Sequence, residues 1–169
     1  FNATVGTDSY DGDGGTDTLR YDVGAAPSGI TAFGTGVTTI TDGSTYTHTL
    51  TEIEQIVGSN TGDTFFLRSG MGDINDLDGA GGNDILNFSL SAQTLFDLSG
   101  AINSVSFSNF EEFIFTDQSD TITTTGADEI IRAGALSDEI RVSLGTDTYD
   151  GGANTGDIVT YNVAGAPTA

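Results

Sequence analysis

The feature that most constrains the fold is a recurring pair of residues, an aspartate followed two positions later by an apolar residue. Five such aspartates follow one another at gaps of 8, 10, 9 and 10 residues: Asp120, Asp128, Asp138, Asp147 and Asp157. Alternation of polar and apolar residues is typical of a strand with one buried face. Gly and Asp also interrupt every window that is long enough for a helix. The spacing predicts a solenoid in which each coil has two strands and two turns over about 18 residues.

The same pair occurs earlier in the chain, at Asp8, Asp17, Asp63 and Asp84, which precede Tyr10, Leu19, Phe65 and Leu86. Stacked coils place equivalent turns about 4.8 Å apart on one edge of the molecule. Counting alternate turns predicts that Asp120, Asp138 and Asp157 share one edge, with Asp128 and Asp147 on the other.

The sequence also repeats over a longer distance. "GTDSYDGDGGTDTLRYDVGAAP" begins at Gly6, and "GTDTYDGGANTGDIVTYNVAGAP" begins 139 residues later at Gly145. Self-similarity at a fixed period is typical of tandem arrays. We therefore expect one elongated segment over 1–169, a piece of a longer chain, in which 145–167 begins the next copy of a repeat of about 140 residues. Shorter sub-repeats are expected at about 6–67, 68–123 and 124–163, with Ile53, Ile56, Asp63 and Phe65 matching Phe110, Phe113, Asp120 and Ile122.

Charge narrows the possible partners. The net charge is −21, from 25 acidic residues against four arginines. Nucleic acid and anionic membrane surfaces require a basic patch, which four scattered arginines do not provide. There is no cysteine and no apolar run of the roughly 18 residues that a membrane span requires. Ten Phe and five Tyr indicate a packed interior, and self-repulsion on this scale favours bound counter-ions.

Calcium is the counter-ion that these residues favour. It binds several oxygen atoms together, from carboxylates and main-chain carbonyls, and glycine-rich turns let the backbone curl around an ion. An ion lying between consecutive turns would bridge carboxylates that otherwise repel. The candidate acidic ligands are Asp8, Asp13, Asp17, Asp63, Asp84, Asp120, Asp128, Asp138, Asp147 and Asp157.

Two stretches carry a resemblance to a known family. "GDGGTDTLR" from Gly12 and "GAGGNDILN" from Gly79 resemble the nonapeptide G-G-x-G-x-D-x-U-x of the RTX (repeats-in-toxin) proteins, where U is apolar. The resemblance places Gly12, Gly15, Gly79 and Gly82 at the glycine positions and Asp17 and Asp84 at the aspartate position. It implies a right-handed parallel β-roll with calcium-binding turns, calcium-dependent folding and export through a type I secretion system.

Other interpretations fit less well. An EF-hand loop from Asp11 would place Thr16 where glycine is required. The single histidine, His48, alternates in phase with Tyr46 and Leu50, which indicates a structural role. Glu111 and Glu112 would face opposite sides of a strand, so they form no glycosidase pair. Glu52 and Glu54 share a face and are expected at the solvated edge of a packed strand. The alternative to calcium-binding turns is an ordinary β-solenoid whose acidic turns are solvated and bind no ion.

The expected function is a non-catalytic, calcium-binding structural repeat of a large secreted bacterial surface protein, such as an adhesin, an S-layer or an extracellular filament. The alternative is an accessory β-roll module of a secreted protease, lipase or polysaccharide-modifying enzyme. The expected partners are calcium ions and neighbouring copies of the repeat stacked end to end. We expect no nucleic acid partner and no transmembrane segment, and the sequence identifies no surface glycan or receptor.

Overall fold

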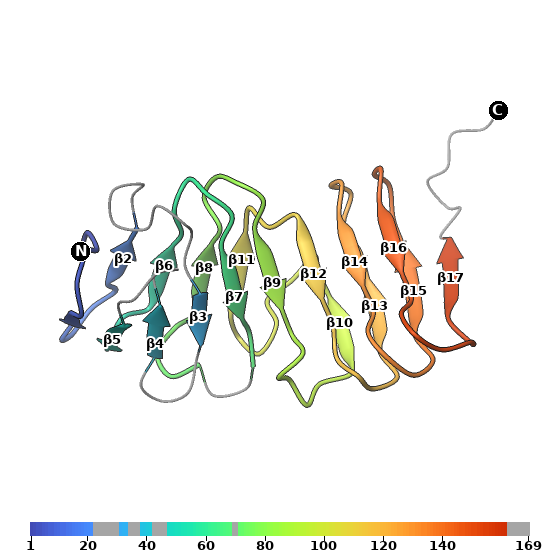
Figure 1. Ribbon diagram of the computed structural model, residues 1–169, viewed down its shortest axis with the longest axis horizontal. Coiled ribbons are helices and arrows are strands. Elements are labelled where there is room, and N and C mark those ends of the chain that lie inside the picture. The colour runs from blue at the N-terminus through green and yellow to red at the C-terminus, as the bar shows by residue number, and fades with distance from the viewer. Residues whose placement is uncertain (22–30, 34–37, 42–46, 69–70, 162–169) are drawn as a thin grey trace.

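The structure is a computed structural model that describes residues 1–21, 31–33, 38–41, 47–68 and 71–161. Within these ranges all regular structure is β-strand, there is no helix, and most strands are three residues long. The strands stack side by side along the long axis of the molecule, as Figure 1 shows. The all-β class is therefore confirmed, and the parallel sheets are compatible with the predicted solenoid. In the described part, no helix exists that could cross a membrane.

The described strands form three sheets. One has nine strands, in the order β1 (Ser9–Asp11), β5 (Thr47–Thr51), β4 (Thr38–Thr41), β3 (Thr31–Phe33), β7 (Thr64–Phe66), β9 (Ile85–Asn87), β12 (Glu112–Ile114), β14 (Ile130–Arg132) and β16 (Thr148–Asp150). The second has four strands: β11 (Ser106–Ser108), β8 (Asp76–Asp78), β6 (Gln55–Val57) and β2 (Thr18–Arg20). The third also has four: β10 (Leu95–Asp97), β13 (Thr121–Thr123), β15 (Glu139–Val142) and β17 (Ile158–Tyr161).

The C-terminal part has the regular coil that the sequence predicts. From β12 onward, consecutive strands alternate between the nine-stranded sheet and the sheet of β13, β15 and β17. The parallel register pairs Glu112 with Ile130 and Ile130 with Thr148, a step of 18 residues each time. The preceding step, from Ile85 to Glu112, is 27 residues because both β10 and β11 lie between them.

The predicted parallel roll is interrupted in the stretch from β3 to β5. There β3 pairs with β4, and β4 with β5, in antiparallel fashion. This threonine-rich stretch has strand-forming, β-branched residues but none of the Asp–apolar pairs that set the period of a coil. Antiparallel neighbours need only a short connection, whereas parallel strands need a longer crossover, so the stretch folds locally.

The core lies between the sheets and takes the central residue of most strands. These inward residues, all at most 4% exposed, are Leu19, Ile56, Phe65, Leu77, Leu86, Phe96, Phe113, Ile122, Ile131 and Ile140. The wide coil that holds β10 is filled by Phe88, Phe96 and Phe115, whose ring centroids are 4.9 to 5.2 Å apart. Most strands whose side chains are described thus have one buried face, as the alternation of the sequence predicts, whereas all four residues of β17 are exposed.

Candidate functional site

Eleven acidic residues lie in turns between the strands, and these turns run along the two long edges of the stack that Figure 1 shows. Each closes a turn immediately before a strand. Asp8, Asp63, Asp84, Glu111, Glu129 and Asp147 precede strands of the nine-stranded sheet. Asp17, Glu54, Asp120, Asp138 and Asp157 precede strands of the two four-stranded sheets. The prediction that Asp120, Asp138 and Asp157 share an edge is therefore confirmed.

Hydrogen bonds link these acids from one coil to the next. The backbone N–H of Asp120 donates to Oδ1 of Asp138 at 2.8 Å, and the N–H of Asp138 donates to Oδ1 of Asp157 at 3.0 Å. We call such a run an acidic ladder. Three more ladders have the same bond, with donors named first: Asp17 to Glu54, Asp63 to Asp84 to Glu111, and Glu129 to Asp147. A side-chain carboxylate is thus built into the stacking of the turns.

Three glutamates in the ladders were not predicted from the sequence. Glu54, Glu111 and Glu129 take the same position as the aspartates, and Glu54 accepts a hydrogen bond from the N–H of Asp17 at 2.6 Å instead of lying at a solvated edge. The signal was present, because each also precedes an apolar residue by two positions. Asp128 is exposed, and its carboxylate accepts the N–H of Thr146 at 2.7 Å.

The sequence pattern predicted Asp128 as the acid of this turn and Ile130 as the inward apolar residue of the strand. This prediction was wrong by one residue. Glu129 is 4% exposed and Ile131 is fully buried, so these two residues hold the inward positions. The sequence "DEII" permits both phases, because two acids precede two isoleucines. A shift of one residue in a strand moves every side chain to the other face.

Five ladder acids are removed from solvent: Asp63, Asp84, Asp120, Glu129 and Asp138 are each at most 4% exposed. Burial raises the pKa of Asp84 to about 6, and the charges of Asp63, Glu111 and Asp78 add to the rise. Burial is also the main cause of the raised pKa values of Asp120, Glu129 and Asp138. A charged carboxylate at these positions costs stability unless something compensates it.

Some of these carboxylates are compensated by a hydroxyl residue four positions earlier. Ser59 donates its N–H to Oδ2 of Asp63 at 2.6 Å and its hydroxyl to Oδ1 at 3.0 Å. Thr116 donates to Asp120 in the same way, with N–H and hydroxyl distances of 2.9 Å. In these turns the acid caps its own loop and both carboxylate oxygens have donors.

Two other buried aspartates lack such a cap. The residue four positions earlier is Ala80 for Asp84 and Gly134 for Asp138, so no hydroxyl is available. The N–H of Ala80 donates instead to Asp78 at 2.9 Å. Within the described part, Oδ2 of Asp84 and Oδ2 of Asp138 are buried without a hydrogen-bond partner. Oε2 of Glu129 is in the same state, because Thr125 reaches only its Oε1.

Glycines bring main-chain carbonyls close to the carboxylates. A Cβ on Gly79 would lie 2.0 Å from the carbonyl oxygen of Asn109 and 2.8 Å from Oδ2 of Asp84. A Cβ on Gly12 would lie 1.9 Å from the carbonyl oxygen of Glu52 and 2.9 Å from Oδ2 of Asp17. Only glycine fits either position, and each turn gathers one carboxylate with a carbonyl of the next coil. This is the mixture of oxygen ligands that calcium binds.

Gly15 and Gly82, the other glycines of the family pattern, both have positive φ, at 141° and 142°. That conformation strains residues with a side chain and favours glycine. Both are exposed. They shape the turns of Asp17 and Asp84.

The remaining candidate ligands lie nearer the surface. Asp13 is exposed, and Asp8 is half-buried, with the hydroxyl of Thr4 donating to its Oδ2 at 2.8 Å. Asp17, Asp147 and Asp157 are half-buried as well. Among the described residues, no three His, Cys, Asp or Glu side chains converge into a metal-binding group. A cation in these turns would therefore require main-chain carbonyls in addition to carboxylates. The turn of Gly79 and Asp84 fits this requirement best.

His48 is fully buried, and Leu50 on the same side of β5 is 3% exposed. The Nδ1 atom of His48 is 2.6 Å from the hydroxyl of Tyr21, and its Nε2 atom is 2.8 Å from the carbonyl oxygen of Gly6. The Tyr21 ring stacks on the imidazole with centroids 5.5 Å apart. The predicted structural role of His48 is consistent with this packing. Tyr46, predicted on the same face, lies outside the described residues.

Comparisons of this chain with family models, with curated proteins and with solved structures find no match.

Proposed function

We propose that this chain is a non-catalytic structural repeat of a large secreted bacterial surface protein, such as an adhesin, an S-layer or a filament, and that it folds on binding calcium after export. Its form would be the right-handed β-roll with calcium-binding turns that the RTX-like stretches imply. The acidic composition and the parallel coils support this proposal. In the proposed mechanism, cations hold the turns together.

One observation carries the proposal: buried carboxylate oxygens lack a partner in turns that have no hydroxyl cap. A buried charge without a partner is costly, and Oδ2 of Asp84 and of Asp138 has no donor. A divalent cation would compensate both these oxygens and the repulsion between successive acids of a ladder. Since such a cation binds the native coil and not the open chain, it stabilises the fold by mass action.

The chain's own residues would have distinct roles at such a site. Asp84 would supply a carboxylate oxygen, while its Oδ1 atom keeps the hydrogen bond from the N–H of Asp63. Gly79 permits the carbonyl of Asn109 to approach, because a side chain at this position would clash with it. At low calcium concentration, repulsion among the 25 acidic residues would oppose folding, which suits a chain exported before it folds.

A calcium titration followed by circular dichroism tests the proposal. We expect a coil-like spectrum in a chelator, a β-sheet spectrum at millimolar calcium, and little response to magnesium, which demands six ligands in near-ideal octahedral geometry. Asp84→Asn combined with Asp138→Asn should weaken the response. Asp73→Asn with Asp117→Asn removes the same charge at two exposed positions outside the ladders and should leave the response intact.

A chain that has the full β-sheet spectrum at neutral pH in a chelator, and gains no stability from calcium, would contradict the proposal. Equal weakening of the calcium response by the two double variants would contradict the assignment of the site, since it would show that net charge alone matters.

A further inference from the structure

The two ends of the described chain have the same local structure. Asn2 forms a parallel bridge with Arg20, and Arg141 pairs with Thr160 in the same way, 139 and 140 residues later. Gly6 and Gly145 both have φ of 138°. Strand β1 corresponds residue by residue to β16, and both have the same alternation of burial. Residues 1–21 and 140–161 are thus two copies of one structural unit.

The two copies differ in what covers them. At the N-terminal end, β1 pairs with β5 and β2 with β6. At the C-terminal end, β16 and β17 are the last strands of their sheets in the described part. Leu19 and Tyr21 are at most 2% exposed, whereas their counterparts Val159 and Tyr161 are 39% and 68% exposed. This difference in exposure comes from the layer formed by β5 and β6, which covers β1 and β2. No corresponding layer covers β16 and β17 in the described part.

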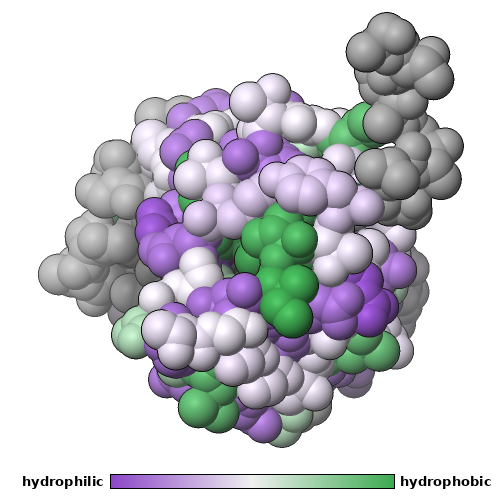
Figure 2. Space-filling view, turned by 90° about the vertical axis from the view of Figure 1, so that its right-hand side faces the viewer, coloured by the Kyte–Doolittle hydropathy of each residue, from purple (hydrophilic) through white to green (hydrophobic). Residues whose placement is uncertain are grey.

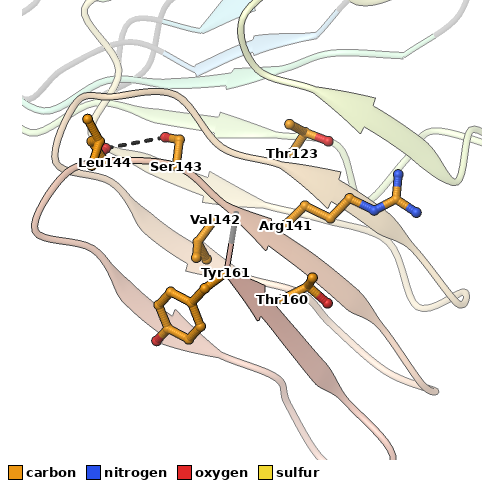
Figure 3. A pocket seen from close by; sticks show the side chains of 7 residues that line it. All are labelled: Thr123, Arg141, Val142, Ser143, Leu144, Thr160 and Tyr161. Atoms are coloured by element: carbon orange, nitrogen blue, oxygen red, sulfur yellow. Dashed lines mark hydrogen bonds between the residues drawn. The ribbon is translucent and has the colours of Figure 1, made fainter. Parts of the chain in front are cut away.

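The uncovered end has an apolar centre. Figure 2 views this end and shows a hydrophobic patch surrounded by hydrophilic and neutral residues. Leu144, Ile158 and Val159 are exposed apolar residues of this end. A hollow of about 700 Å³ lies beside the ring of Tyr161, next to Val142 on the neighbouring strand (Figure 3). Exposed apolar patches rimmed by polar residues mark interaction sites.

The end also repeats four residues that surround His48. That imidazole contacts the Gly6 carbonyl and the Tyr21 hydroxyl, lies 3.9 Å from Asp8 and packs edge-on against Tyr10. The four corresponding residues are present at the C-terminal end as Gly145, Asp147, Tyr149 and Tyr161. The chain has a single histidine, so no second one is available to occupy this position.

We propose that the C-terminal end is a docking surface for residues 47–57 of a following copy of the repeat. Strand β5 of that copy adds to β16 with Leu50 opposite Tyr149, and β6 adds to β17 with Ile56 opposite Val159. His48 of the following copy enters between Tyr149 and Tyr161. This inference rests on the structural-repeat part of the proposed function and is independent of calcium.

The register follows from the pairs that are present at the other end. There Tyr10 is opposite Leu50 and Leu19 is opposite Ile56. In a separate molecule, residues 47–57 are already covered by that molecule's own β1 and β2. Docking therefore requires a following copy in the same chain, or displacement of the first coil in another.

An extended chain tests the inference: residues 1–161 followed directly by residues 22–169, so that 140–161 serve as the first coil of the second copy. Hydrogen exchange of peptides from 145–161 should slow by at least about tenfold relative to the single chain, the factor that burial of one further Leu-sized side chain corresponds to. NMR should show two histidine rings in matching environments. Tyr161→Phe should shift only the second ring, and Tyr21→Phe only the first.

Unchanged exchange of 145–161 in the extended chain would overturn the inference, as would a second histidine ring whose NMR shifts do not match those of the first. The measurements are made both with calcium and in a chelator. Protection of 145–161 that needs no calcium would support the docking surface while contradicting calcium-dependent folding. A calcium-induced fold that leaves 145–161 unprotected would support calcium-dependent folding and contradict the docking surface.

Discussion

Replacing Asp84 by asparagine separates the cost of a buried charge from the benefit of an ion. Asparagine keeps the Oδ1 atom that accepts the N–H of Asp63. Its amide nitrogen would take the place of the unpaired Oδ2, close to the carbonyl of Asn109. The variant therefore exchanges an uncompensated acceptor for a donor, in a side chain of nearly the same shape.

The magnitude follows from the raised pKa. Because the pKa of Asp84 rises from 3.8 to about 6 on folding, the native state holds this proton more tightly than the unfolded chain. The contribution of Asp84 thus lowers the free energy of unfolding as the pH rises from about 4 to about 6, by about 3 kcal/mol in total. The raised pKa values of Asp120, Glu129 and Asp138 act in the same direction.

In a chelator at pH 7.5, Asp84→Asn should therefore raise the free energy of unfolding, by up to about 3 kcal/mol, and should flatten its dependence on pH. In calcium this advantage of the variant should largely disappear, because the wild type gains about 2.7 kcal/mol at about 100 times the Kd and the variant gains less. Urea titrations followed by circular dichroism measure both. If the calcium-free wild type is unfolded without urea, the stabilisation appears as β-sheet signal gained by the variant.

Asp73→Asn makes the same change of charge at an exposed position and should shift stability by no more than about 0.5 kcal/mol. An Asp84→Asn chain that is no more stable than the wild type in a chelator would refute the argument from burial. A variant that is stabilised in a chelator and still gains the full effect of calcium would show that the ion binds elsewhere.

Three further substitutions test the packing, each by urea titration in calcium. Gly79→Ala should cost about 3 kcal/mol because its Cβ would lie 2.0 Å from a carbonyl oxygen, while Gly14→Ala, with nothing within 4 Å, should be nearly neutral; equal effects would contradict the close approach. Phe88→Ala should cost about 3–5 kcal/mol by opening a cavity in the aromatic cluster, and a loss below about 1 kcal/mol would mean that the coil collapses around it. Thr116→Val should cost about 1–3 kcal/mol by removing the hydroxyl from Asp120, and an unchanged stability would show that the backbone N–H alone suffices as a cap.

Much of the regular part of this fold could be predicted from the sequence. Short Asp–apolar pairs gave the strand positions, the step of 18 residues between Glu112 and Ile130, and the shared edge of Asp120 and Asp138. These features depend on local alternation, which a single sequence displays directly. The threonine-rich strands β3 to β5 lack the pair, so their antiparallel arrangement was not predictable from the same pattern.

The candidate site was less predictable, since its chemistry depends on contacts between coils. Glu54 and Glu111 could have been predicted as ladder acids if the pattern had allowed glutamate as well as aspartate, since both precede an apolar residue by two positions. The missing partner of Oδ2 of Asp84 could not be predicted from the sequence, because it depends on where the N–H of Ala80 points. That N–H donates to Asp78, at the end of the preceding strand.

An aspartate at the end of a turn does not by itself indicate a calcium site. The residue four positions earlier helps to show whether the carboxylate requires a cation. With Ser59 or Thr116 at that position, the turn supplies its own donors and the carboxylate needs no cation. With Ala80 or Gly134, one oxygen is left buried and unpaired. Both kinds of turn occur in the ladder of Asp63 and Asp84 and in the ladder of Asp120 and Asp138, so an ion in every turn would be redundant where a hydroxyl already compensates the charge. Calcium should concentrate at the turns of Asp84 and Asp138, and fewer ions than turns would hold the stack together.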